Sequence, residues 1–203
     1  MRTKICGLTT EREVRQAVGA GADAVGFLVR VPVDSHREIS VERAHELARA
    51  TPPFVTTVAV TMPASPEEAG AVAVDTGVDA VQIHEAGFEG GEELRRRGIK
   101  LIKKARPGET PPDEADAYVV DTEGERGAGG TGETHDWSET RAFVERVDRP
   151  VVLAGGLTPD NVAEAVREVR PYAVDVSSGV ERDGSKDDEL VRRFVERARE
   201  AGR

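Results

Sequence analysis

The chain of 203 residues has a single cysteine, Cys6, and only 4% aromatic residues. One cysteine excludes an internal disulfide and a zinc site built from several cysteines. No apolar run is long enough to span a bilayer, and the first residues turn charged too early for a signal peptide. We therefore expect a cytoplasmic protein that does not associate with membranes.

Positive charge is also scarce: 28 lysines and arginines face 38 aspartates and glutamates, for a net charge of −10. The acidic residues are spread over the predicted helices, as in Glu67-Glu68 and Glu92-Glu93, rather than gathered in a tail. Such a surface repels phosphates, which argues against nonspecific nucleic-acid binding. Acidic surfaces stay solvated in concentrated salt, so the composition favours a halophilic source over an ordinary acidic cytosolic protein.

Strand and helix patterns alternate from end to end, with no linker that would divide residues 1–203 into two domains. Eight strands are predicted at 2–5, 23–29, 54–61, 80–83, 100–103, 117–120, 151–154 and 173–176. Helices are predicted at 11–19, 41–50, 66–76, 89–97, near 111–114, at 137–147, from a Thr158 cap onward, and at 187–201. Eight such units predict an α/β fold, a single-domain (β/α)8 TIM barrel. An open doubly wound sheet is the alternative, but the first strand lacks its glycine fingerprint.

Two turns rich in small residues follow the last two predicted strands. Gly155 and Gly156 come directly after 151–154, and Ser177, Ser178 and Gly179 come directly after 173–176. Turns of this kind on neighbouring parallel strands offer backbone N–H groups to an anion, and this part of a barrel is a frequent phosphate site. We therefore predict a phosphate site there, with two ordinary tight turns as the alternative.

Chemically useful side chains follow several other strands. In a barrel these strand ends meet at one mouth, so a thiol, carboxyl groups and an arginine would converge beside the phosphate site. This predicts an enzyme whose site includes Cys6, Arg37, Thr61, His84, Asp121 and Asp175. His84 is as readily interpreted as a packed histidine, and the remaining histidines show no ligand spacing, so no metal site is predicted.

Seven segments, in order and at family-like spacing, resemble phosphoribosylanthranilate isomerase. They are Lys4–Thr9 (KICGLT), Ser35–Ser40 (SHREIS), Val81–His84 (VQIH), Gly129–Gly132 (GGTG), Asp136-Trp137, Ala154–Leu157 (AGGL) with Asn161-Val162, and Val174–Glu181 (VDVSSGVE). The resemblance implies an Amadori rearrangement of N-(5-phosphoribosyl)anthranilate to carboxyphenylamino-deoxyribulose phosphate in tryptophan biosynthesis. It implies no metal or organic cofactor, and a small-molecule substrate as the only partner. A monomer and a homodimer both remain open.

The resemblance also implies roles for single residues. Cys6 would be the general base, Asp121 the general acid, and Arg37 the group that binds the anthranilate carboxylate. The phosphate would lie on the backbone of Gly155-Gly156 and Ser178-Gly179, with Asp175 near the substrate. The chemistry suits these types, since burial can keep a carboxyl group protonated and a cationic environment can make thiolate available.

The sequence departs from the family at Glu38, Glu85 and Glu133, and Thr61-Met62-Pro63 follows the third strand in place of a common Phe-Val-Asn. Glu38 and Glu133 place negative charge near an anionic substrate. Other phosphate-binding barrels, such as a pentose-phosphate epimerase or an indole-glycerol-phosphate synthase, remain alternatives. A phosphate-metabolite binding module without catalysis is a third possibility, against which the presence of both Cys6 and Asp121 argues.

Overall fold

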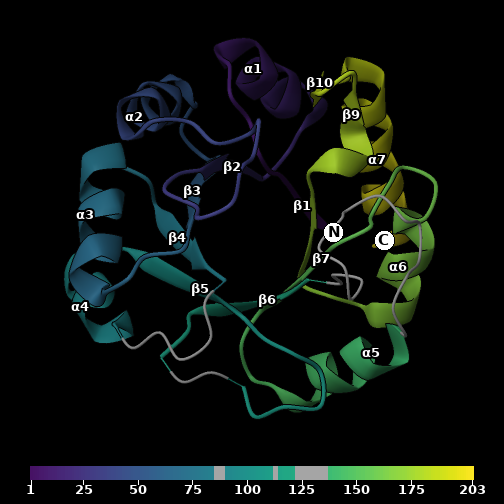
Figure 1. Ribbon diagram of the computed structural model, residues 1–203. Helices are drawn as coiled ribbons and strands as arrows, with labels where there is room; N and C mark the ends of the chain where they lie inside the picture. The colour runs from purple at the N-terminus through teal and green to yellow at the C-terminus, as the bar shows by residue number, and fades with distance from the viewer. Residues whose placement is uncertain (85–89, 112–113, 122–136) are drawn as a thin grey trace.

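The computed structural model describes residues 1–84, 90–111, 114–121 and 137–203 (Figure 1). Eight parallel strands follow one another in chain order and close into a barrel, because β1 pairs with β8 as well as with β2. The predicted closed barrel is therefore confirmed, and the open sheet is excluded. The strands are β1 (Arg2–Ile5), β2 (Ala24–Leu28), β3 (Thr56–Thr61), β4 (Ala80–Ile83), β5 (Lys100–Lys104), β6 (Ala117–Asp121), β7 (Val151–Ala154) and β8 (Ala173–Val176).

Helices lie around the ring of strands, and α7 packs against both α1 and α6 (Figure 1). They are α1 (Glu11–Ala20), α2 (Val41–Ala50), α3 (Pro66–Thr76), α4 (Gly91–Arg96), α5 (Trp137–Arg146), α6 (Val162–Val169) and α7 (Asp188–Ala201). Between β8 and α7 lie a 3-10 turn, η1 (Ser178–Val180), and a small antiparallel hairpin of β9 (Glu181–Arg182) and β10 (Ser185–Lys186). In the part of the chain that the structure describes, no helix is long and apolar enough to cross a membrane.

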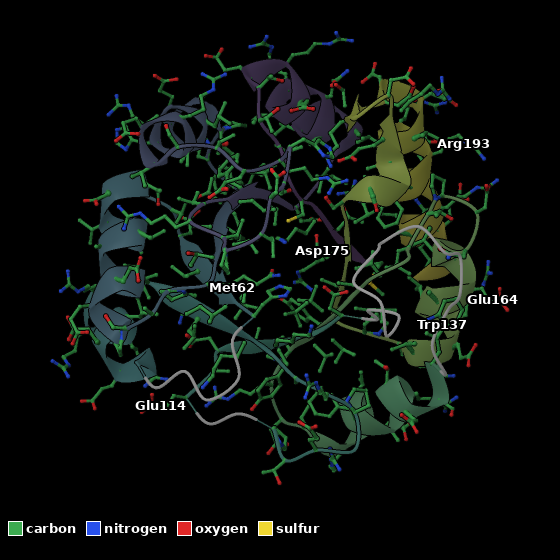
Figure 2. All side chains as sticks on the ribbon, in the orientation of Figure 1. Met62, Glu114, Trp137, Glu164, Asp175 and Arg193 are labelled. Atoms are coloured by element: carbon green, nitrogen blue, oxygen red, sulfur yellow. The ribbon has the colours of Figure 1, made fainter. Side chains whose placement is uncertain are left out.

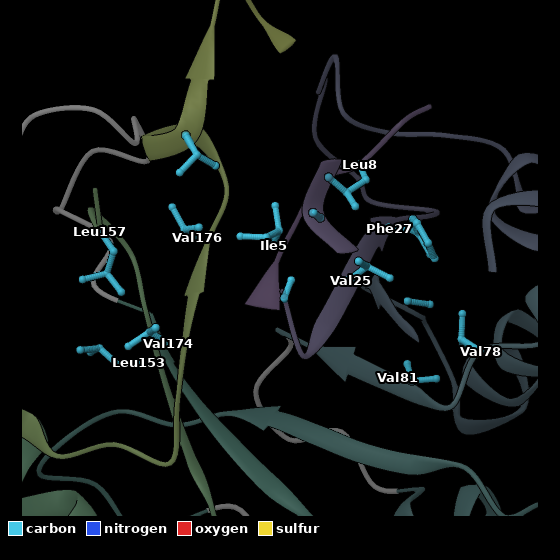
Figure 3. Packing of buried hydrophobic residues seen from close by; sticks show 14 of the residues in the cluster. Ile5, Leu8, Val25, Phe27, Val78, Val81, Leu153, Leu157, Val174 and Val176 are labelled. Carbon is cyan, nitrogen blue, oxygen red and sulfur yellow. The ribbon is translucent and has the colours of Figure 1, made fainter. Parts of the chain in front are cut away.

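Alternation along the strands separates two apolar layers. Residues such as Ile5, Val25 and Val174 point outward and pack under the helices in the main core (Figure 3). Inside the barrel, Val119, Val152, Ala154 and Ala173 form a smaller cluster. One level nearer the carboxyl ends of the strands, the interior becomes polar. The barrel floor is thus a packed core, and the mouth above it is available for chemistry.

Three predicted boundaries are wrong. Phe54 lies before β3, because its backbone is left-handed (φ 75°) and its side chain is fully exposed. Thr158 does not cap α6. Instead the Asn161 side chain accepts from the Thr158 amide (2.8 Å) and donates to the Gly156 carbonyl (2.9 Å), so the helix starts after this turn.

The third wrong boundary is the short helix near 111–114. Residues 112–113 lie outside the described residues, and neither Pro111 nor Glu114 is helical. Glu114 has a left-handed backbone (φ 62°), and its carboxylate accepts from the Gly90 and Gly91 amides at the start of α4.

Candidate active site

Cys6 follows β1 directly and is 7% exposed. Because side chains two apart in a strand share a face, the sulfur lies on the same side as Lys4, which is 4% exposed. Gly26 of β2 makes room for both: a Cβ there would lie 2.8 Å from the Cys6 Sγ and 3.2 Å from the Lys4 Nζ. Burial raises the pKa of the Cys6 thiol above its ordinary value, although the nearby Lys4 and Lys186 oppose this shift. The expected cationic environment is present, but burial outweighs it in the unliganded protein.

Asp175 points into the barrel from β8, where it stands level with Lys4 of β1 (Figure 2). The Lys4 Nζ donates to the Asp175 Oδ2 at 2.7 Å and to the Gln82 Oε1 at 3.1 Å. The Gln82 amide nitrogen in turn lies 2.8 Å from the Nε2 of His84, directly after β4. A continuous polar chain therefore runs across the barrel interior from β8 through β1 to β4. It joins two predicted site residues, Asp175 and His84, through two that were not predicted.

Arg37 lies in the loop after β2 and binds Glu181 through both edges of a fork, Nε to Oε1 at 2.7 Å and Nη2 to Oε2 at 2.6 Å. The Lys186 ammonium, only 1% exposed, donates to the same carboxylate and to the Ser177 carbonyl. Burial alone would raise the pKa of Glu181, but hydrogen bonds from Arg37 and Lys186 lower it to about 2. A guanidinium has five N–H donors, so this pairing holds Arg37 in place and leaves donors on it.

The two predicted phosphate turns lie against each other. A Cβ on Gly179 would lie 1.9 Å from the Leu157 carbonyl oxygen, so only glycine allows the turn after β8 to touch the turn after β7. Gly155 and Gly156 both have left-handed backbones, with φ of 81° and 62°. Gly7 joins this group to the thiol, because a Cβ there would meet the side chains of Arg37 and Ser177. The described residues thus form one continuous rim from Cys6 to Gly156.

Asp121 is the last residue of β6 and is half-buried. It lies at the same mouth, and the segment that follows it, 122–136, lies outside the described residues. The family-like segment at 129–132 and the departure at Glu133 fall in this segment, and the departure at Glu85 falls in residues 85–89, which are also outside the described residues. Glu38 is described: its carboxylate accepts from the Val31 amide at 3.2 Å, so it serves the loop after β2.

Thr61 does not belong to this rim. It is fully buried at the end of β3, and its hydroxyl donates to the Arg30 carbonyl at 3.4 Å. Thr61 stands level with Ile83, which packs in the outward core, so its side chain lies on the outward face of the strand. A position at the end of a strand does not by itself say which face the side chain occupies.

Four residues of the network were missed as site residues, namely Lys4, Gln82, Glu181 and Lys186. Lys4 and Gln82 could have been found by alternation, since each lies two residues before a predicted site residue on the same strand face. Asp183-Gly184, both with left-handed backbones, form a tight hairpin turn that places Glu181 opposite Lys186. An Asp-Gly dipeptide is typical of a hairpin turn, so it could have predicted that Glu181 and Lys186 lie opposite each other. Among the described residues, no group of three or more potential metal ligands (His, Cys, Asp or Glu) lies together.

The fold and the rim define the class: a (β/α)8 barrel whose mouth holds a thiol and carboxyl groups beside two turns that contain glycine. A sequence model of the N-(5'-phosphoribosyl)anthranilate isomerase family matches residues 3–197. The chain is 50% identical over 208 residues to the protein of that name from Haloferax volcanii, covering 98% of this chain and 94% of the relative. It is 52% identical to the Halobacterium salinarum protein, covering 97% and 95%.

Solved structures agree with these relatives. The phosphoribosylanthranilate isomerase of Thermotoga maritima is 35% identical and superposes with a TM-score of 0.80, over 98% of this chain and 99% of that one. A phosphoribosylanthranilate isomerase in complex with reduced 1-(o-carboxyphenylamino)-1-deoxyribulose 5-phosphate is 36% identical, with a TM-score of 0.78 over the same shares. The chain belongs to the phosphoribosylanthranilate isomerase family. The relatives from halophilic archaea also agree with the halophilic interpretation of the composition.

Proposed function

We propose that this protein is a cytoplasmic phosphoribosylanthranilate isomerase of tryptophan biosynthesis, with Cys6 as general base and Asp121 as general acid. The observation that carries the proposal is the rim itself. The thiol, Arg37 and the two glycine turns come from opposite ends of the chain, and Gly7 and Gly179 pack them into one continuous surface. A substrate with a phosphate at one end and a carboxylate at the other suits this layout.

The reaction needs two proton transfers. Asp121 gives a proton to the furanose ring oxygen, the bond from C1′ to that oxygen breaks, and the aminoaldose becomes an open-chain iminium ion. The Cys6 thiolate then takes the proton from C2′, and the C–H electrons form the C1′–C2′ double bond while the iminium nitrogen becomes neutral. Tautomerisation of this enol gives the ketose. The iminium acidifies the C2′ proton, so a thiolate suffices as base.

Charge and hydrogen-bond donors support the binding roles. Arg37, held by Glu181, would receive the anthranilate carboxylate on its remaining donors. The backbone of Gly155, Gly156, Ser178 and Gly179 would receive the phosphate beside η1. Ser177 would lie between them, and Asp175 and His84 would line the sugar-facing side of the mouth.

Fluorescence of the anthranilate group tests the activity directly, because it disappears on turnover and persists on simple binding. The purified protein should consume phosphoribosylanthranilate, and its gene should restore growth to a tryptophan auxotroph that lacks this isomerase. Cys6→Ser should fold normally, since the volume is similar, but lose about 10²–10⁴-fold in turnover because an alcohol is much harder to ionise than a thiol. Persistent fluorescence with the wild-type protein would leave a binding module, and a near-normal rate in Cys6→Ser would remove Cys6 from the mechanism.

The surface at the amino ends of the barrel strands, which we call the amino mouth, favours a homodimer. Phe54 is fully exposed there, and a groove of about 830 Å³ beside it is lined by apolar groups that include Val55, Ile102 and Tyr172. The phosphoribosylanthranilate isomerase of Thermotoga maritima, which is 34% identical, is dimeric and has been solved as engineered monomers, so a relative does dimerise. Light scattering should give a dimer for the wild type and a monomer for Phe54→Asp. A wild-type monomer would contradict the proposal.

A further inference from the structure

Lys4 is a buried charge of the site that the proposed mechanism leaves without a task. At 4% exposure, an ammonium group is costly to bury unless its charge is matched. Asp175 supplies one negative charge at 2.7 Å, and Gln82 supplies a neutral acceptor at 3.1 Å. Burial alone would lower the pKa of Lys4, but attraction to Asp175 and Cys6 outweighs it and raises the value, so Lys4 stays charged.

The charged groups that face the thiol do not balance. They are Lys4 from β1, Asp175 from β8, Lys186 from β10 and Arg37 from the loop after β2. Glu181 binds Arg37 and Lys186 but carries only one charge. Among the residues that the structure describes, these three cations therefore face two carboxylates, Asp175 and Glu181, and a thiolate at Cys6 would neutralise the group.

Lys4 is the cation with direct access to the sulfur. The missing side chain of Gly26 leaves one gap that both the Lys4 ammonium and the Cys6 sulfur border, and the charge of Lys4 opposes the rise that burial causes in the pKa of the thiol. Lys186 is directed to Glu181 and Ser177 instead. Asp175 and Gln82 tether the ammonium from two other strands, which fixes its position.

We infer that Lys4 is a positioning residue for the isomerisation: held by Asp175 and Gln82, it pairs with the Cys6 thiolate across the gap at Gly26 and aims it at the sugar. This inference rests on the proposed role of Cys6 as base. In this arrangement, the Asp175 carboxylate and the Cys6 thiolate compete for the Lys4 ammonium. An alternative is that Lys4 serves only to neutralise Asp175.

The test measures thiolate directly and does not depend on turnover. Cys6 is the sole cysteine, so thiolate absorbance in the ultraviolet, with the matching Cys6→Ser protein subtracted, reports this one group. Lys4→Met should move the thiolate titration up by at least about one pH unit, which is a tenfold loss of thiolate at a fixed pH below the midpoint. Asp175→Asn should move it down. The pH profile of kcat/KM should shift in the same directions.

The control is Lys100→Met, which removes the lysine of another Lys–Asp pair (3.5 Å to Asp116) at the opposite mouth. It changes the net charge equally and should leave the titration in place. The double variant Lys4→Met/Asp175→Asn separates the two interpretations. A titration that stays above that of the wild type supports the inference, whereas a return to the wild-type titration and rate would reduce Lys4 to a counterion of Asp175.

Two further outcomes are decisive. If Lys4→Met does not fold, Asp175→Asn still decides, because an unchanged or upward titration in that folded variant overturns the inference. If the titrations shift as expected but no variant, nor the wild type, turns over substrate, the pairing stands and the proposed function fails.

Discussion

At the amino ends of the strands, Asp23, Asp79 and Asp116 accept from backbone amides of the neighbouring strand: Thr3, Thr57 and Leu101, at 2.8 to 2.9 Å. At the carboxyl ends, Asp175 and Glu181 are bound by ammonium and guanidinium groups.

At the amino mouth the cations lie further from these carboxylates, with Lys100 3.5 Å from Asp116 and Arg199 3.6 Å from Asp23. Backbone amides are their closest partners, and because an amide is fixed by its strand, these carboxylates secure the register. At the carboxyl mouth the closest partners are side-chain cations, which can share their charge with a thiol or a substrate. In barrels of this kind, the amino face serves stability and the carboxyl face chemistry.

The largest effect is expected at the carboxyl mouth, from Asp121→Asn. The amide keeps the shape but cannot deliver the proton, so kcat should fall by about 10²–10⁴-fold while substrate binding and the thermal midpoint stay near those of the wild type. Steady-state kinetics and direct substrate titration measure the two. Equal losses in binding and rate would make Asp121 a binding residue and place the acid elsewhere.

Glu181→Gln should come next, because it leaves two cations without their carboxylate. We expect a loss of about 3 kcal/mol in the free energy of unfolding, with a higher KM from the untethered Arg37. Urea unfolding and steady-state kinetics measure these, with Glu164→Gln on the exposed face of α6 as the matched control (Figure 2). A variant as stable as that control would show that the network is not a source of stability.

The same carboxylate sets an acid limit. Its pKa in the folded protein, about 2, lies below the ordinary value of about 4.3, so its stabilisation is complete above about pH 4.3 and is lost as the pH falls towards 2. The stability difference between wild type and Glu181→Gln should therefore shrink over that interval.

A smaller effect is expected at the amino mouth. Asp79→Ala removes the acceptor for the Thr57 amide and hydroxyl, both at 2.8 Å. Since Asp79 is exposed, water can take its place, and we expect a loss of about 1 kcal/mol in the free energy of unfolding with kcat and KM unchanged. A changed rate would show that this mouth also influences catalysis.

The smallest effect is expected from salt on the buried network. Salt should change the thermal midpoint, which depends on the exposed surface charge, more than it changes the titration of Cys6. Raising potassium chloride from about 0.1 M to about 1 M shortens the screening length from ~10 Å to ~3 Å, which relieves repulsion in a chain of net charge −10. The thermal midpoint should rise, and activity should rise at least initially. The thiolate titration of Cys6 should move by less than about 0.5 pH unit, because buried pairs are screened less. Sodium sulfate at matched ionic strength distinguishes screening from preferential exclusion. A flat thermal midpoint would leave the acidic composition unexplained by salt adaptation.

The barrel was predictable because its signals are local. Each strand is a short apolar run bounded by turn residues, and each of the caps at Thr10, Ser40 and Asp187 stands next to its helix. The phosphate turns were predictable for the same reason, since glycine and serine mark turns wherever they occur. Phe54 was misplaced because its apolar side chain fits a strand, while the two prolines before it and its left-handed backbone do not.

The charge network was less predictable, because its members lie far apart in sequence. Lys4 and Asp175 are separated by 171 positions, and the local sequence around either residue does not predict its contact with the other. Strand order and register place them level, and register follows from closure of the whole barrel. The strand-end rule located Cys6 and Asp121, but the groups that shift the pKa of Cys6 lie deeper in the strands or beyond β8.

Closure between the first and last strands has a consequence for how the protein is made. Lys4 leaves the ribosome ~10–30 s before Asp175, Glu181 and Lys186 at ordinary rates of synthesis, because at least 171 positions separate it from them. Until then, β1 has an unpaired edge and Lys4 lacks its carboxylate, so burial of that ammonium in the amino-terminal units would cost free energy. The thiol therefore acquires its cationic neighbours in the same step that closes the barrel. A nascent or truncated chain would hold an ordinary cysteine, and reactivity of Cys6 would report completion of the fold.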